Sequence, residues 1–455
     1  MPRLTFHGGA LSVTGANYLI ETKKSKVLVD CGMIQGGKHC DDANYKPFAY
    51  DASKIDAVFV THAHIDHTGR LPKLIKEGFR GKIFATAPTA ELAALMLDDS
   101  QEIVEDQCGP ELGALYSKKD VTTTENAFEP VVYGGVTTVT EDIAVRFMDA
   151  GHILGSAIVE IFIQEGNDKT KLVFSGDLGN PPTPLLDHFA YIRDADYVIT
   201  ESTYGDRLHE DKAVRKSLLE NAIEDTVTRG GVLMIPSFAL ERTQEILFEL
   251  NELVENKRIP ETPIFLDSPL AIKATEVYRK HTSFFNESAL SLIAAGDKLF
   301  DFPRLKLTMR TEESKAINEV PAPKLIIAGS GMSTGGRILH HEKHYLPDPK
   351  SMLLFIGYQA EGTLGRRILE GEQEVSIMGD TVPVRAEIRA IGGYSAHADQ
   401  NTLLEWVRVI RDGGGMKRVF CVQGEEQAAN ALAVKLRDTM AVNTVVPRLG
   451  DAVEL

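Results

Sequence analysis

One seven-residue stretch constrains this chain more than any other. Residues 61–67 read Thr-His-Ala-His-Ile-Asp-His and directly follow an apolar run, residues 57–60. Imidazole and carboxylate groups are ligands that zinc accepts, and manganese or iron can also use them. A loop of solvated or hydrogen-bonded histidines is the alternative. Three histidines and one acid in so short a span favour a metal site over that alternative.

The spacing within this stretch predicts two metal ions. If the strand of the apolar run continues through His64, the alternation of side chains places His62 and His64 on one face, directed at a single ion. Asp66 and His67 then lie beyond the strand end, where they can bind a second ion.

Polar residues follow other predicted strands at the same relative position. The runs 144–148, 172–174 and 197–200 lead into His152, Asp177 and Glu201, respectively. Each is an ordinary loop residue taken alone, but the repeated strand-end position suggests that they share one rim. Asp30 ends an earlier strand, and we expect it to fix a ligand histidine through that histidine's second ring nitrogen. A plain turn aspartate is the alternative for Asp30.

Length, charge and cysteine content limit the class of protein. A chain of 455 residues is expected to form two or three units, each with its own core. The net charge of -16 argues against broad polyanion binding, so any nucleic-acid contact must be local. The four cysteines have no CxxC spacing, which argues against a disulfide framework or a thiolate zinc site. The first residues do not resemble a signal peptide, and the apolar runs are too short to span a membrane, so we expect a cytoplasmic protein without membrane contact.

A second region, residues 207–383, contains strands that alternate with helices, which predicts a largely parallel sheet. Two of its turns, 329–337 and 357–367, are rich in glycine and hydroxyl groups and lead into arginine-bearing helix starts. That arrangement can hold phosphate, although tight helix-strand packing is the alternative. The predicted phosphate or RNA contacts are Arg242, Ser330, Gly335, Gly336, Arg337, Thr363 and Arg366.

The stretch between these regions has less pattern. Apolar residues at helical spacing predict a helix over residues 89–107. Residues 108–130 are polar, and we interpret them as an irregular surface segment.

The histidine and aspartate motif, with Asp30 before it and His152 and Asp177 after it, resembles the metallo-β-lactamase fold, an αββα sandwich of the α/β class. The resemblance implies that His62, His64 and His152 bind one metal, that Asp66 and His67 bind the other, and that Asp177 bridges the two ions. Two zinc ions are therefore expected. Many hydrolases share this signature, so it indicates the fold better than the substrate.

The later segments resemble the inserted β-CASP domain of nucleases of the messenger-RNA 3'-end processing type and their bacterial and archaeal relatives. Residues 201–205 look like the motif A of that family, residues 394–399 look like motif B, and 236–245, 329–337 and 357–367 look like its RNA-facing loops. The resemblance implies domains at residues 1–206 and 384–455, which together form the metallo-β-lactamase domain, and an α/β insertion at 207–383. It further implies a minimal version without KH extensions or a long C-terminal domain.

One position departs from the family. Motif C carries a histidine before Gly-Glu, and here that position is Gln423. The family histidine binds the second metal, so its loss places the second zinc in doubt. The amide oxygen of Gln423 can still act as a ligand, but it suits harder ions better than zinc. Cys421 is expected to share a strand face with Gln423 and is a weaker candidate ligand.

These features predict a metal-dependent ribonuclease that cleaves single-stranded RNA, internally or from its 5' end, with a metal-activated water. The expected catalytic residues are Asp66, His397 as the general acid, and Glu201, which keeps His397 protonated. Arg337 or Arg366 is expected to absorb charge on the phosphoryl oxygens. A structural hydrogen-bond pair is the alternative for Glu201 and His397.

Two other functions remain open. One is a hydrolase of small esters or thioesters, and the other is an RNA-binding subunit with weakened catalysis, of which Gln423 would be a first sign. The resemblance also suggests a homodimer.

Overall fold

Apolar residues of the N-terminal strands face two different layers in alternation. In strand β3 (Lys26–Val29), Val27 and Val29 pack into a core between two sheets, whereas Leu28 packs into a second core beneath helices. Period-two burial of this kind is what strands covered on both faces require. The computed structural model describes residues 1–35, 42–209, 214–360 and 362–455, without the side chains of residues 106–111.

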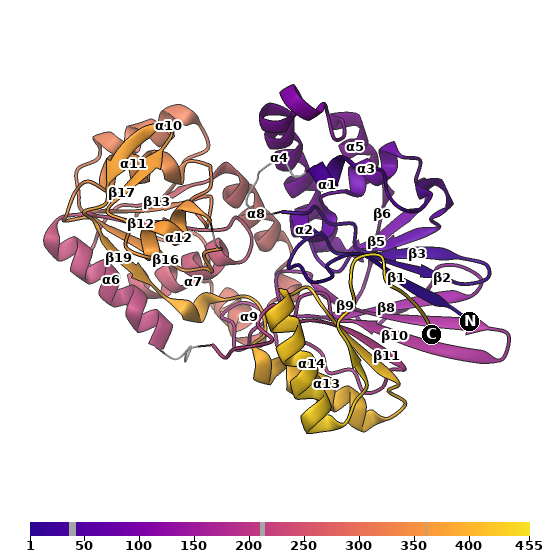
Figure 1. Ribbon diagram of the computed structural model, residues 1–455. Helices are drawn as coiled ribbons and strands as arrows, with labels where there is room; N and C mark the ends of the chain where they lie inside the picture. Colours follow the sequence, from indigo (N-terminus) through magenta and orange to yellow (C-terminus); the bar gives the residue numbers. More distant parts are fainter. Residues whose placement is uncertain (36–41, 210–213, 361) are drawn as a thin grey trace. The chain divides into compact units, whose positions relative to one another are not determined.

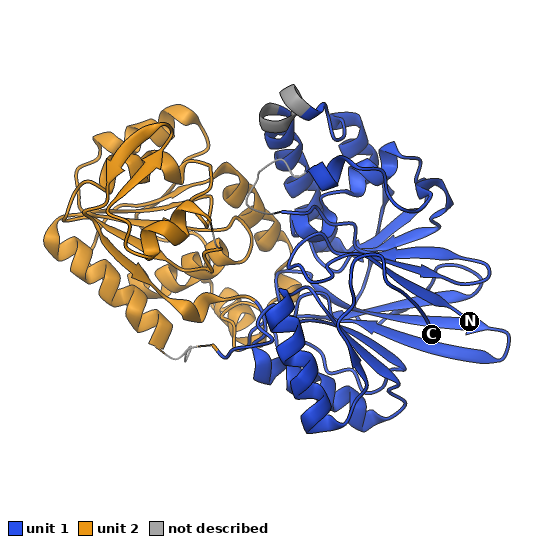
Figure 2. Ribbon diagram, in the orientation of Figure 1, with its two compact units in different colours: residues 1–181, 187–208, 397–455 blue, residues 182–186, 209–396 orange. Residues whose placement is uncertain are grey.

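By internal contacts the described chain divides into two units (Figure 2). The first unit contains residues 1–181, 187–208 and 397–455, and the second contains residues 182–186 and 209–396. The second unit extends to Ala396 because strand β19 (Glu387–Ala390) pairs with β16 (Met352–Phe355) of its sheet. The predicted domain division at residue 383 stays a prediction.

The first unit is built on two seven-stranded sheets (Figure 1). In spatial order, one sheet contains β22 (Ala452–Glu454), β1 (Arg3–Gly8), β2 (Asn17–Glu21), β3, β4 (Ala57–Phe59), β5 (Lys82–Thr86) and β6 (Phe128–Val131). The other contains β21 (Thr444–Val445), β20 (Arg418–Val422), β11 (Tyr197–Glu201), β10 (Asp168–Phe174), β9 (Ala157–Glu165), β8 (Ile143–Asp149) and β7 (Val136–Thr138).

Helices cover the outer face of each sheet of the first unit. Leu71 and Leu74 of α3 pack on the first sheet, and Trp406 of α13 and Leu432 of α14 pack on the second. The first unit is therefore an αββα sandwich, which confirms the predicted fold class. Its helices are α1 (Asp42–Tyr45), α2 (Ile65–Thr68), α3 (Leu71–Lys76), α4 (Ala87–Leu112), α5 (Lys118–Ala127), α13 (Gln400–Gly413) and α14 (Glu426–Met440), with a 3-10 turn η1 (Ala52–Lys54).

The second unit contains a six-stranded sheet in which each pair of neighbouring strands is parallel. Its order is β14 (Leu305–Leu307), β13 (Ile264–Asp267), β15 (Lys324–Ala328), β12 (Val232–Pro236), β16 and β19, and β17 (Glu374–Ile377) and β18 (Asp380–Pro383) form a separate hairpin. Its helices are α6 (Arg215–Arg229), α7 (Arg242–Glu255), α8 (Pro269–Lys280), α9 (Glu287–Ala294), α10 (Thr311–Ala316), α11 (Ile338–Tyr345) and α12 (Leu364–Leu369), with the 3-10 turns η3 (Thr282–Phe284), η4 (Ile317–Glu319) and η5 (Gly392–Tyr394). The predicted parallel sheet of this region is confirmed.

The prediction of an irregular segment over residues 108–130 was wrong. Helix α4 continues to Leu112, and α5 begins after Ser117. Ser117 and Asp120 form a reciprocal capping box, in which the Asp120 carboxylate accepts the Ser117 N–H at 2.8 Å. Val121 and Thr124 are buried. Helix α5 lacks a regular apolar stripe, so the capping residues Ser117 and Asp120 were the local sequence signal for a helix start.

Two of the four cysteines have described side chains, and both are free. Cys31 and Cys421 are buried free thiols, while Cys40 and the side chain of Cys108 lie outside the described residues. Among the described residues, no helix is long and apolar enough to cross a membrane.

Candidate metal centre

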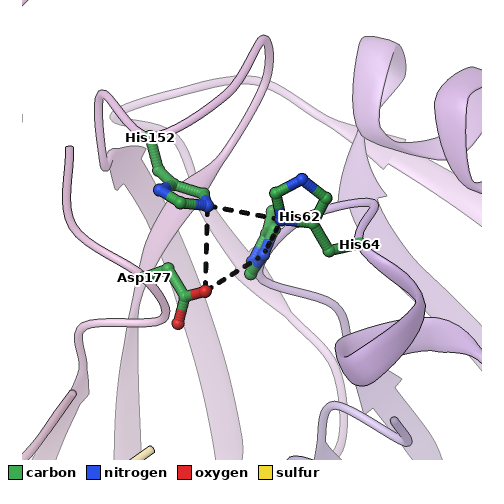
Figure 3. Close-up of side chains that lie close together, drawn as sticks. All are labelled: His62, His64, His152 and Asp177. Atoms are coloured by element: carbon green, nitrogen blue, oxygen red, sulfur yellow. Dashed lines mark hydrogen bonds and ion pairs between the residues drawn. The ribbon is translucent and has the colours of Figure 1, made fainter. Parts of the chain in front are cut away.

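Three histidines and one aspartate converge at one edge of the first unit (Figure 3). His64 Nδ1 lies 3.1 Å from His62 Nε2 and 3.3 Å from His152 Nε2. Asp177 Oδ2 lies 3.5 Å from His62 Nε2 and 3.7 Å from His152 Nε2. The four residues come from segments that follow β4, β8 and β10, so strand ends bring them together.

The chemistry of this first group fits a cation. Each residue offers one ligand atom, and these atoms all lie within 4.8 Å of one another. Burial and the neighbouring His67 hold the pKa of His62 well below its usual value, so its ring is neutral and presents a lone pair. Three imidazole nitrogens and one carboxylate oxygen form a donor set suited to zinc.

Asp66, His67 and Asp177 form a second group. His67 Nε2 lies 3.6 Å from Asp66 Oδ2 and 3.5 Å from Asp177 Oδ1. Asp177 therefore directs one carboxylate oxygen at each group. Its Oδ1 is buried and accepts no hydrogen bond from any described residue. A buried carboxylate oxygen that accepts no hydrogen bond is costly, and a cation held by this group would satisfy it.

The charges of the second group offset one another. Burial alone would raise the pKa of Asp177, but the imidazoles of His67 and His62 outweigh it and hold that pKa well below its usual value. Burial likewise opposes charge on His67, yet Asp177, Asp30 and Asp66 raise the His67 pKa well above normal. A cation bound by this group would offset the negative charge of Asp66 and Asp177 in place of the proton on His67, because the cation and the proton would face the same carboxylates.

The motif does not lie on an extended strand, contrary to the prediction. Strand β4 ends at Phe59, and His64 is already the residue that precedes helix α2. After the strand, the Thr61 N–H donates to Asp30 Oδ1 at 2.8 Å instead of to a neighbouring strand. His62 and His64 nevertheless face each other, because the turn and the helix start bring their rings together.

Asp30 lies behind His67, in the place predicted for it. Its Oδ2 lies 2.7 Å from His67 Nδ1 and also accepts the Thr61 hydroxyl proton at 2.9 Å. A proton on His67 Nδ1 leaves the Nε2 lone pair directed at the second group.

The hydroxyl of Thr61 was not predicted as part of the site. Thr61 Oγ1 lies 3.1 Å from His62 Nδ1 and donates to Asp30, so one hydroxyl orients ligands of both groups. Its position directly before His62 in the sequence was the only available signal, and threonine at a strand end is common for other reasons.

Replacing Asp30 with alanine is expected to weaken metal binding by the second group about 10- to 100-fold, because His67 loses the partner that orients it. Metal titration against a chromophoric chelator measures this effect. Binding by the first group should change less, since none of its four ligands contacts Asp30. The Asp30→Asn variant keeps an oxygen acceptor and should show an intermediate loss. Unchanged affinity in both variants would contradict the role of Asp30.

Glu201 and His397 form a pair beside the first group. His397 Nδ1 lies 3.1 Å from Glu201 Oε2 and 3.8 Å from Asp177 Oδ2. Glu201 is fully buried, and its Oε1 accepts the Leu178 N–H at 2.6 Å, which fixes the carboxylate. Burial opposes charge on His397, but Glu201 outweighs it and raises the His397 pKa to about 9. His397 is therefore protonated at neutral pH and, with its side chain 28% exposed, can reach a bound molecule.

Gln423 directly follows β20 and faces the second group. Its Nε2 lies 3.0 Å from His67 Nε2. Cys421 does not share this direction, contrary to the expectation from strand alternation: it is buried in the core beneath α13 and α14. The strand ends at Val422, and Gln423 has a φ of +44°, so alternation no longer holds there.

The three predicted phosphate-binding arginines belong to the second unit, and each has a protein partner. Arg242 is 6% exposed, and its guanidinium donates to Glu245 and to the Tyr394 carbonyl. Arg337 donates to Asp267 Oδ1 at 2.7 Å and to two main-chain carbonyls at 2.9 Å. Both guanidinium groups therefore donate hydrogen bonds to other parts of the protein, whereas the sequence pattern suggested that they are available to bind phosphate.

The other predicted contacts lie on turns of the same unit. The Ser330 hydroxyl accepts the Thr334 N–H at 2.9 Å, and Thr363 caps α12 by accepting the Arg366 N–H at 3.3 Å. Arg366 is more exposed and pairs with Glu370 at 2.7 Å. A side chain at Gly336 would meet the Gly329 carbonyl oxygen at 2.4 Å, whereas Gly335 faces open space. Close packing thus explains Gly336, and RNA contact by these residues stays a prediction.

Three family models match the sequence. Residues 13–227 match the metallo-beta-lactamase superfamily, residues 243–368 match the Beta-Casp domain, and residues 381–447 match the Zn-dependent metallo-hydrolase RNA specificity domain. Together they extend over both units.

Curated relatives match the chain over nearly its whole length. Ribonuclease TTHA0252 of Thermus thermophilus is 39% identical over 99% of both chains. An RNase J-like protein of Methanocaldococcus jannaschii is 33% identical, also over 99% of both chains. Transcription termination factor FttA of Methanosarcina mazei is 33% identical over 97% of this chain and 70% of its own length. A crystal structure of a protein of unknown function from Enterococcus faecalis aligns with a TM-score of 0.57 at 11% identity over 100% of both chains, which shows a shared fold.

Proposed function

The chain is a member of the β-CASP family of the metallo-β-lactamase superfamily, and we propose that it is a metal-dependent ribonuclease that hydrolyses phosphodiester bonds of single-stranded RNA. Two relatives that match over nearly their full length carry ribonuclease names, which supports this substrate. The role of the protein is then in RNA processing or decay.

One observation carries the proposal. Two groups of ligand side chains share Asp177, and an acid-histidine pair lies next to that same aspartate. Cations held by these two groups would lie beside a protonated imidazole, and that combination would suit phosphodiester hydrolysis, in which both the attacking and the leaving oxygen need stabilisation. A simple ester hydrolase has less need of a general acid held so close.

The first group, His62, His64, His152 and Asp177, would hold zinc, and Asp66 and His67 would hold a second ion together with Asp177. When bound, such cations lower the pKa of a coordinated water and neutralise charge on the phosphoryl oxygens. Two ions per chain are proposed from the two groups.

The protein's own contribution is to orient the reacting groups and to move one proton. Asp30 and Thr61 fix the ring orientations of His67 and His62, so their lone pairs face the ligand positions. Glu201 holds His397 through Nδ1, and His397 delivers a proton from Nε2 to the leaving 3' oxygen. Cleavage then leaves a 5' phosphate on the downstream product.

The other expectations are proposals of the same kind. The turns of the second unit supply contacts to the RNA backbone, with Arg366 the most exposed of the three predicted arginines, so binding should weaken strongly with salt. The domain division at residues 206 and 383, a homodimer and a cytoplasmic location stay predictions.

Removal of metal tests the function directly. Chelator-treated protein is expected to cleave a 5'-labelled single-stranded RNA at least about 100-fold more slowly, because the cations supply both the activated water and charge neutralisation. Zinc or manganese should restore cleavage, and the product should carry a 5' phosphate. A generic thioester serves as the comparison substrate.

Two outcomes would contradict the proposal. Tight RNA binding without cleavage at any metal concentration would identify an RNA-binding subunit. Thioester hydrolysis that RNA does not inhibit would identify a small-ester hydrolase.

A further inference from the structure

The backbone of Gln423 is fixed by hydrogen bonds on both sides. Its N–H donates to the Gly9 carbonyl at 2.7 Å, and its carbonyl accepts the Ser202 N–H at 3.1 Å and the Thr203 hydroxyl at 3.0 Å. A Cβ at Gly9 would lie 2.5 Å from the Gln423 side-chain oxygen, so glycine there makes room for the amide. The side chain is 3% exposed, and its amide is directed toward His67.

The amide has one satisfied and one unsatisfied end. Nε2 lies 3.0 Å from His67 Nε2 and donates to the Val13 carbonyl at 3.3 Å. Oε1 is buried and accepts no hydrogen bond from the part of the chain that the structure describes. Because His67 Nδ1 faces Asp30, its other ring nitrogen, Nε2, faces the Gln423 amide.

The two ends of an amide can exchange places. A half turn about the last side-chain bond replaces the nitrogen of Gln423 by its oxygen at nearly the same position. With nitrogen toward His67, the amide of Gln423 can donate to an unprotonated Nε2. With oxygen toward His67, the amide can accept a hydrogen bond from a protonated Nε2, or the oxygen and the Nε2 lone pair can bind the same cation. Gln423 can thus serve the second group both with and without an ion.

The resulting donor set differs from that of the first group. The first group offers three imidazole nitrogens and one carboxylate oxygen, whereas the second offers one imidazole nitrogen from His67 and carboxylates from Asp66 and Asp177. An amide oxygen from Gln423 makes the second set three oxygens and one nitrogen. Oxygen donors suit manganese and magnesium, and imidazole suits zinc.

We propose that Gln423 makes the second metal position of this chain selective for a harder divalent cation such as Mn²⁺, while the first position holds zinc. The inference rests on the proposed metal-dependent function but concerns which ion binds. Since zinc binds most sites more tightly than manganese, the relevant quantity is the ratio of the manganese and zinc dissociation constants at the second position.

The test measures metal binding and not cleavage. Full-length protein is loaded with one zinc per chain, and Mn²⁺ binding is followed by electron paramagnetic resonance while zinc competes; metals retained after dialysis are counted by mass spectrometry. We expect wild type to retain one zinc and to bind one Mn²⁺. Gln423→His should retain two zinc ions and raise the preference for zinc at the second position at least about tenfold.

Two further variants separate the amide oxygen from general effects of substitution. Gln423→Leu has a similar size but no donor, so it should bind the Mn²⁺ about 10- to 100-fold more weakly. Gln101→Leu removes a buried glutamine of α4 whose amide donates to Glu105, and it should bind metals as wild type does.

Retention of two equally tight zinc ions by wild type, or unchanged Mn²⁺ binding by Gln423→Leu, would overturn the inference. The ribonuclease proposal is judged separately by RNA cleavage. A protein with the expected metal preference that does not cut RNA would contradict only that proposal, and an active protein with two tight zinc ions would contradict only this inference.

Discussion

Replacing Asp177 with alanine is expected to lower cleavage of single-stranded RNA by at least about 1000-fold, which corresponds to about 4 kcal/mol of transition-state stabilisation. The reason is that its two carboxylate oxygens serve different groups. Oδ2 lies 3.5 Å from His62 Nε2, and Oδ1 lies 3.5 Å from His67 Nε2. No other described side chain belongs to both of these groups. The variant should therefore also lose metal from both positions, as counted per chain by mass spectrometry.

A buried aspartate outside the site provides the control. Asp142 is 5% exposed and accepts hydrogen bonds from Ser25 and Thr22, but it contacts neither ligand group. Asp142→Ala should lose stability in thermal unfolding while its metal content stays that of wild type. If Asp177→Ala kept both metals and cleaved RNA within about tenfold of wild type, the bridging role would be wrong.

Replacing His397 with glutamine is expected to slow RNA cleavage about 100- to 10,000-fold while metal content stays unchanged. His397 Nδ1 lies 3.1 Å from Glu201 Oε2 and 3.8 Å from Asp177 Oδ2, and His397 is not one of the four ligands of the first group. Without a general acid, the 3' oxygen must leave as an alkoxide, which is a poor leaving group. The Glu201→Gln variant should show a smaller loss of the same kind, because His397 would keep its place but lose the charge that favours its proton.

A substrate with a good leaving group distinguishes catalysis from structural support. A phosphodiester of p-nitrophenol needs no proton on its leaving oxygen, so His397→Gln should hydrolyse it at close to the wild-type rate. Equal losses on RNA and on the p-nitrophenyl ester would instead mean that Glu201 and His397 only hold the site in shape.

Local sequence patterns were sufficient to predict which residues are candidate ligands. They were insufficient to predict the backbone conformation of the segments that carry these residues. His152 and Asp177 were placed on one rim because each follows a strand end. Strands β8 and β10 both pair antiparallel with β9, so they end at the same edge of the sheet, and His152 and Asp177 lie 3.7 Å apart. The extension of β4 through His64 was wrong, because Asp30 takes the Thr61 N–H that a longer strand would have used. The alternation of apolar and polar residues along one segment cannot show that a residue distant in sequence, here Asp30, binds the N–H that would extend the strand.

The arginines predicted to bind phosphate also show that a local pattern does not reveal partners from distant segments. Arg337 follows a glycine-rich turn, which is the local signature of a phosphate site, yet its guanidinium is bonded to Asp267, which lies on another strand. A pattern can identify a donor but not the acceptor that the fold supplies. Partners from remote segments are set by packing of the whole sheet.

The sequence by itself therefore determined the chemical composition of this centre: three histidines, two aspartates and a further histidine in a spacing that only metal binding explains well, and a glutamine where the family has a histidine. Only the tertiary structure decided what each side chain faces. It directed the two oxygens of Asp177 at two groups and brought Gln423, from the far end of the chain, to within 3.0 Å of His67. The physical reason is that ligand type is a property of single residues, whereas hydrogen-bond partners depend on which strands become neighbours in the folded sheets.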